Sequence, residues 1–197
     1  MSRTTRKLDE ARFFMARLED STAAHPQFDY FLSAFVSASR SVSWVMKAEY
    51  KERPGWLEWY ESKQPVGDEK AILAKMNDLR VRSEKFEPLE TRTSIVLEIP
   101  PERVTPALRD MLDGGIGNGF KLWLYAVPDS GPTNVPGEIP SGAITTLGTF
   151  QGLERHLPEF EDQDVVSACK AYLIVLEVLV QQSEEVVNAA SQVTPAK

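Results

Sequence analysis

Apolar side chains recur at three- and four-residue steps through residues 27–50, which is the period of one face of an α-helix. The recurring positions are Phe28, Phe31 and Leu32, Phe35, Ala38 and Ser39, Val42, and Val45 and Met46. Small residues such as Ser37 and Ser41 lie between them, so another helix can approach closely. Arg40 falls in the middle of the segment and needs a polar partner if it is buried. The pattern predicts a central, tightly packed helix with Phe35 in the core.

Other segments also have helical character. They span residues 7–20, 56–62, 68–85 and 165–188. Asp68 is a typical N-cap for the helix at 68–85. The buried face of that helix is marked by Ile72, Met76, Leu79 and Phe86. The last helix is apolar almost all round between residues 171 and 180, which predicts a central place in the bundle.

The composition changes after residue 90. The β-branched run at residues 91–99 predicts a strand that Pro100 and Pro101 close. Two more strands are expected at residues 120–127 and 143–150, with a short helix at residues 105–112. The glycine cluster at residues 113–119 precedes a strand rather than a helix, so it predicts a turn and not a phosphate-binding loop.

These elements predict a mainly α fold, in which an antiparallel helical bundle carries a small antiparallel β insertion before the last long helix. We expect a single domain over residues 1–197, with the bundle at residues 7–88 and 161–190 and the β-rich insertion at residues 91–150. A chain of 197 residues buries roughly 70% of its unfolded surface, so it needs neither a metal nor a disulfide to hold its core.

The charge of the chain argues against one class of partner. Its net charge is −7, and an acidic protein is a poor general ligand for the nucleic-acid backbone. A local basic site remains open, because several cations lie near the N-terminus. They are Arg3, Arg6, Lys7 and Arg12.

The hydropathy pattern favours a cytoplasmic protein without a membrane segment. Asp9 and Arg12 interrupt any apolar run long enough for a signal peptide. The apolar stretch at residues 165–180 carries Lys170 and is shorter than the ~20 residues that a spanning helix needs. The single cysteine, Cys169, cannot form an internal disulfide and is expected to be a buried, inert thiol.

The chain shows no recognisable catalytic or metal-binding motif. Neither His25 nor His156 has zinc-ligand spacing around it, so the first is interpreted as a helix-entry residue and the second as a surface or loop residue. No nucleophile motif surrounds Cys169 or any serine. The acids at residues 159–164 are typical of a solvated helix cap. The sequence therefore predicts no catalytic residue, no metal and no cofactor.

Aromatic residues gather around the end of the long helix. They are Trp44, Tyr50, Trp56, Trp59 and Tyr60. Such a cluster can line a ligand pocket or stack on a base, but few basic residues are interleaved with it. Packing of the short helix onto the long one is the simpler interpretation.

A family resemblance rests on three of these segments. FDYFLSAFVSASRSVSWVMKAEY is followed by the pair Trp59 and Tyr60, and then by a helix containing DLRVRSEKFEP. Together they resemble uncharacterised bacterial proteins related to the HEPN helical domains, over roughly residues 8–88 and the final helix. The resemblance implies an up-and-down antiparallel bundle that is commonly dimeric. Active members of that group resemble one another in an arginine followed shortly by a histidine, and they cleave RNA without a metal.

The chain departs from the family at that arginine-histidine motif. No histidine follows Arg80 or Arg82, so no group of near-neutral pKa is present there to exchange a proton with the ribose. We therefore expect a non-catalytic interaction or accessory protein of HEPN-like type that pairs with itself or with another protein. Arg40, Arg80 and Arg82 are its candidate binding residues. The alternatives are a metal-independent HEPN-like ribonuclease of toxin or defence type, which would make RNA a partner, and a small-ligand binder that uses Arg40 and the aromatic cluster.

Overall fold

The computed structural model describes most of the helical part of the chain and part of the β-rich insertion. The described residues are 1–24, 26–98, 100, 122–125, 149–160 and 163–193. The chain divides into two compact units, one formed by residues 1–90 with 166–197 and the other by residues 91–165. The first is a helical bundle and the second contains a small antiparallel sheet that precedes the last helix, so the predicted fold class is confirmed.

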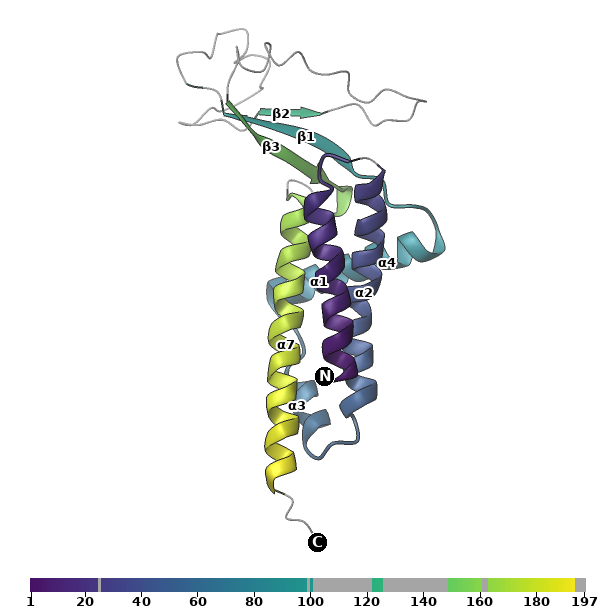
Figure 1. The fold of residues 1–197 in the computed structure, drawn as a ribbon, viewed down its shortest axis with the longest axis vertical. Helices are drawn as coiled ribbons and strands as arrows, with labels where there is room; N and C mark the ends of the chain where they lie inside the picture. The colour runs from purple at the N-terminus through teal and green to yellow at the C-terminus, as the bar shows by residue number, and fades with distance from the viewer. Residues whose placement is uncertain (25, 99, 101–121, 126–148, 161–162, 194–197) are drawn as a thin grey trace. The chain divides into compact units, whose positions relative to one another are not determined.

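The helical unit is built from long helices that lie side by side. Its described helices are α1 (Arg3–Asp20), α2 (Gln27–Tyr50), α3 (Trp56–Ser62), α4 (Gly67–Lys85) and α7 (Val165–Val193). In Figure 1, α1 runs between α2 and α7. The start of α1 meets the end of α2, since Thr4 is hydrogen-bonded to Glu49. Helices α1 and α2 are therefore antiparallel.

The core follows the face of α2 that the sequence pattern predicts. Phe28, Leu32, Phe35, Val42 and Met46 are all completely buried. The ring of Phe35 meets the ring of Tyr172 on α7 edge to face, with 6.5 Å between their centroids. Aromatic pairs favour this geometry because the positive edge of one ring meets the negative face of the other. The predicted facing of α2 is confirmed.

Three helix ends differ from expectation, and one of them is the end of the last helix, which runs to Val193 rather than to residue 188. The first helix begins at Arg3 rather than at residue 7, because Ser2 caps it by accepting the backbone N–H of Thr5 at 2.9 Å. The Glu49 carboxylate accepts the next two free N–H groups, those of Arg3 and Thr4, at 3.0 and 2.8 Å. The fourth begins at Gly67, so Asp68 lies inside its first turn instead of capping it. Phe86 is 79% exposed rather than buried, because it follows the last helical residue and no longer belongs to the helix face.

Helices α1 and α7 meet along a regular polar seam. Three positions of α1 at seven-residue steps face three positions of α7 at the same steps; the pairs are Thr5 with Glu184, Arg12 with Glu177 and Glu19 with Lys170. The Arg12 and Lys170 ion pairs measure 2.7 and 2.6 Å. Seven residues are about two helical turns, so one side of each helix faces the other along the whole seam.

The second unit contains a three-stranded antiparallel sheet. Its strands are β1 (Arg92–Glu98), β2 (Leu122–Tyr125) and β3 (Thr149–His156), in the order β2-β1-β3. The third strand runs to His156 instead of ending at residue 150, because its backbone continues to pair with β1 across an irregularity between Val96 and Leu97. Gly152 pairs with Val96 there and adopts a φ of +154°, a conformation that favours glycine. The expected strand residues 143–148, the helix at 105–112 and the glycine turn at 113–119 lie outside the described residues.

Candidate functional site

Two of the three candidate arginines meet on the surface formed by α2 and α4. The guanidinium carbon of Arg40 lies 5.6 Å from the ring centroid of Trp44, and that of Arg80 lies 5.3 Å from the same ring. Both distances are within the range of a cation–π interaction. The indole of Trp44 itself is 56% exposed. Arg82 approaches Glu87 at 4.0 Å.

Arg40 is half-buried and matched by neutral oxygen atoms. Its Nε donates to the side-chain carbonyl of Asn77 at 3.2 Å, and its Nη1 donates to the hydroxyl of Ser43 at 3.1 Å. A carbonyl partner agrees with the expectation that this arginine is shielded and matched. Among the described residues no carboxylate forms an ion pair with Arg40, so its charge is balanced by these two dipoles and by the Trp44 ring.

Arg80 has an acidic neighbour on its own helix. Its Nη1 donates to Glu84 at 2.9 Å, and the other carboxylate oxygen of Glu84 accepts the hydroxyl of Ser37 at 3.1 Å. The Arg80 side chain is only 16% exposed, and its Nε has no hydrogen-bond partner within the described part of the chain. The cluster of Arg40, Trp44 and Arg80 thus carries two cations and one carboxylate beside an exposed indole, a composition typical of protein interfaces.

The remaining aromatic residues form the packed end of the bundle. Trp56 is completely buried, and its Nε1 donates to the Ser183 hydroxyl of α7 at 2.7 Å. Tyr60 stacks on Trp56 with 4.9 Å between centroids, and Tyr50 lies at 6.1 Å. These contacts are those of a short helix packed onto its neighbours. Trp44 belongs to the arginine cluster instead, as the four-residue spacing from Arg40 could have indicated.

The sequence did not predict that large apolar side chains of α1 and α7 are exposed to solvent. Phe13 is 53% exposed, Ile174 59% and Val178 48%. Because Arg12 pairs with Glu177, Phe13 lies at the same level of the bundle as the other two. Helix α7 contacts α1, α2 and α3, as its predicted central place implies, but Ile174 and Val178 show that its apolar surface is not covered all round. We call these three residues the seam patch.

The length and composition of α7 also match those of a membrane-spanning helix. Within residues Val165–Ala190, the most apolar window of 18 residues has a mean hydropathy of 1.5, and 33% of that window is buried. The core helices of bundles pass the same test, so hydropathy does not distinguish the two cases.

The described histidine and its acidic neighbours lie in the second unit. His156 was expected in a loop, but it lies on β3 and is buried, with its Nε2 3.8 Å from Glu154. Asp164 accepts the backbone N–H of Arg155 at 3.0 Å. Over the ranges that the structure describes, no three histidine, cysteine or acidic residues converge on a point where a metal could bind. His25 lies outside those ranges, and Cys169 is buried as expected.

Comparison with known proteins adds no family: no family model, no curated protein and no solved structure matches this chain. The HEPN-like resemblance therefore rests on the sequence motifs alone. The chain is a mainly helical protein with a small antiparallel sheet.

Proposed function

We propose that this chain is a non-catalytic interaction protein of HEPN-like type, which pairs with a second copy of itself through the outward face of α1 and α7. The observation that carries the proposal is the seam patch of Phe13, Ile174 and Val178. Apolar surface in water costs roughly 25 cal/mol per Å² relative to burial. Large apolar side chains gathered at one place on a surface mark interaction sites.

The charges around the seam patch favour a second copy as its occupant. On α7, Lys170 lies before Ile174 and Val178, and Glu185 lies after them, and both charged residues are exposed. If two α7 helices cross antiparallel about a twofold axis between Ile174 and Val178, each Lys170, which also pairs with Glu19 of its own chain, approaches the end of the partner helix that carries Glu185. Such a surface is complementary to itself, as a twofold dimer requires.

The footprint of this face approaches the size of a dimer interface. With 18 residues in α1 and 29 in α7, the two helices present roughly 700 Å² at 1.5 Å per residue and about 10 Å per helix width. A stable interface of standard size takes about 800 Å² from each partner. The resemblance to a commonly dimeric family supports the same proposal, and the lack of a histidine after Arg80 or Arg82 supports a non-catalytic role.

The test places a charge on the seam patch. Ile174→Glu and Val178→Glu keep good helix-forming residues at exposed positions, so the fold is expected to survive. In sedimentation velocity over a concentration series, the parent should have twice the 22.1 kDa chain mass. Each variant should weaken the dimer more than about a hundredfold, because two like charges face each other near the axis.

The matched control is Phe86→Glu, which adds the same charge at an exposed apolar residue elsewhere. It should leave the dimer intact. A parent that stays monomeric at the highest concentrations contradicts the proposal, and so does a dimer that tolerates Ile174→Glu. Flotation of the parent with anionic vesicles that is lost in Ile174→Glu would instead make the face a membrane-binding surface and would also overturn it.

A further inference from the structure

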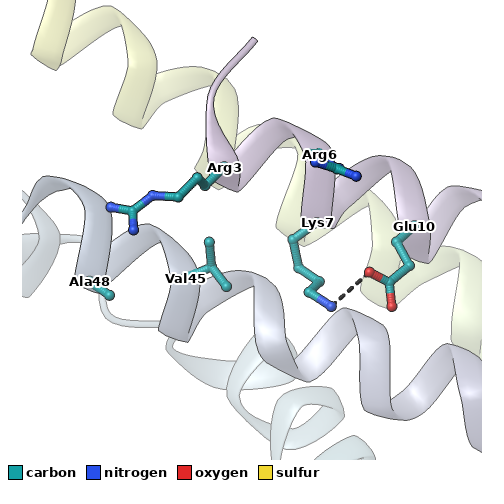
Figure 2. Close-up of a pocket in the computed structure, with 6 residues that line it drawn as sticks. All are labelled: Arg3, Arg6, Lys7, Glu10, Val45 and Ala48. Carbon is teal, nitrogen blue, oxygen red and sulfur yellow. Dashed lines mark hydrogen bonds and ion pairs between the residues drawn. The ribbon is translucent and has the colours of Figure 1, made fainter.

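A second surface feature lies between the beginning of α1 and the last turns of α2. It is an open groove of about 380 Å³, lined by Arg3, Arg6, Lys7, Glu10, Val45 and Ala48. Figure 2 shows Arg3 and Lys7 extending from α1 toward α2, where Val45 and Ala48 form the opposite side. The volume falls in the range of small-molecule sites rather than protein interfaces.

The groove is positive although the chain as a whole is acidic. Lys7 is paired with Glu10 at 2.7 Å. Arg3 has only a long contact of 3.8 Å with Glu49, and its side chain is 72% exposed, so solvent screens that pair. Arg6 forms no ion pair with any residue in the described ranges. Two guanidinium groups therefore keep unused donors at the rim of the groove.

Backbone donors of α1 are not free to bind an anion there. Glu49 accepts the N–H groups of Arg3 and Thr4 and also the Thr4 hydroxyl, at 3.0, 2.8 and 2.7 Å. Burial acts to raise the pKa of Glu49, but these hydrogen bonds and the nearby Arg3 hold that pKa below its ordinary value. The carboxylate stays ionised as a fixed cap. An anionic ligand would therefore be held by the arginine side chains, which can bind a carboxylate or a phosphate through two parallel hydrogen bonds.

The residues on the α2 side of the groove indicate what the uncharged part of a ligand would be. Val45 and Ala48 are aliphatic, and none of the six lining residues is aromatic, so the groove offers no surface on which a base could stack. We infer that the groove binds a small organic anion, with a carboxylate or phosphate head held by Arg3 and Arg6 and a short aliphatic chain lying on Val45 and Ala48. This site is separate from the seam patch and does not depend on self-association.

The inference is tested by titrating the full chain with sodium octanoate, followed by calorimetry and by ligand-observed NMR. Octanoate should bind saturably in the millimolar range or tighter. Butanoate should bind roughly tenfold more weakly, because its shorter chain covers less of the aliphatic side. Octyl phosphate used in parallel identifies the preferred head group, and binding of either head group supports the site.

Substitutions then locate the binding. Arg3→Gln and Arg6→Gln should each weaken octanoate roughly tenfold, the effect of losing a charge-assisted hydrogen bond. Ala48→Glu, which puts a carboxylate into the groove, should abolish binding. The control Lys85→Gln removes an exposed cation from the end of α4 and should bind octanoate like the parent. Far-UV circular dichroism checks that each variant is folded.

Three results would overturn the inference. The first is no saturable binding of octanoate or of octyl phosphate. The second is binding that Arg3→Gln, Arg6→Gln and Ala48→Glu all leave unchanged. The third is equal affinity for butanoate and octanoate, which would show that Val45 and Ala48 contribute nothing to recognition.

Discussion

Truncating Phe35 to alanine is the sharpest test of the fold. This side chain is completely buried on α2 and meets the ring of Tyr172 on α7 edge to face. It therefore joins the two longest helices of the bundle at a point where no water enters. Phe35→Ala removes the ring and leaves an apolar void between them, which the surrounding rigid helices can fill only in part.

The expected loss is large in comparison with the total stability of a protein. A buried phenylalanine replaced by alanine costs about 3–5 kcal/mol, of which the edge-to-face contact supplies about 0.5–1.5 kcal/mol. Domains are commonly stable by about 5–15 kcal/mol, so the variant would lose a substantial fraction of its folding free energy. In a chain of 197 residues this corresponds to a drop in Tm of roughly 10 °C.

The assay is urea unfolding followed by far-UV circular dichroism, with Phe86→Ala as the matched control. That control removes the same ring from a residue that is 79% exposed, so its midpoint should stay near the parent value. Phe35→Ala should shift the midpoint to lower urea without changing the slope. If both variants unfold at the parent midpoint, Phe35 is not in the core and the packing of α2 on α7 is wrong.

Two further predictions concern Tyr172 and RNA. Burial raises the pKa of Tyr172 to about 12, against the opposing effects of Arg40 and Ser39. The pKa of Tyr172 in the folded state lies above its ordinary value of 10.0. Its neutral hydroxyl should therefore make its full contribution to the free energy of unfolding below about pH 10. About 2–3 kcal/mol should be lost as the pH rises toward 12, and comparison with Tyr172→Phe isolates that loss. Purified protein should leave generic single-stranded RNA intact with or without magnesium. Cleavage that disappears in folded Arg80→Ala or Arg82→Ala would restore the ribonuclease alternative.

Local signals predicted most of the helical elements. The bounds of α2 and α3 agree with expectation because Pro26, Pro54 and Gly55 separate them and each helix has its own periodicity. The start of α1 also has a local signal, because Ser2 is its N-cap and accepts the backbone N–H of Thr5. The further contribution of Glu49, which accepts the N–H groups of Arg3 and Thr4, could not be predicted locally, because Glu49 is far along the chain and becomes a neighbour only after α1 and α2 have paired.

The sequence indicated part of the arginine site but not its arrangement. Arg40 stood out because it is a charge in the middle of an apolar helix face. Its contact with Trp44 follows from four-residue spacing, whereas the approach of Arg80 to the same indole depends on how α4 packs on α2. The end of β3 could not be predicted for the same reason. Residues 151–156 form a strand because they pair with β1, and not because of their composition.

Helix α7 shows why hydrophobicity alone does not determine burial. A helix that is apolar all round can be surrounded by other helices, inserted in lipid or packed against a second protein chain. Its polar seam residues Lys170 and Glu177 bind α1, so one side of α7 is fixed inside the bundle. Ile174 and Val178 then have no neighbour in the described part of this chain that buries them. Apolar residues at these positions contribute little to the stability of one isolated chain, and the proposed contact with a second copy would bury them.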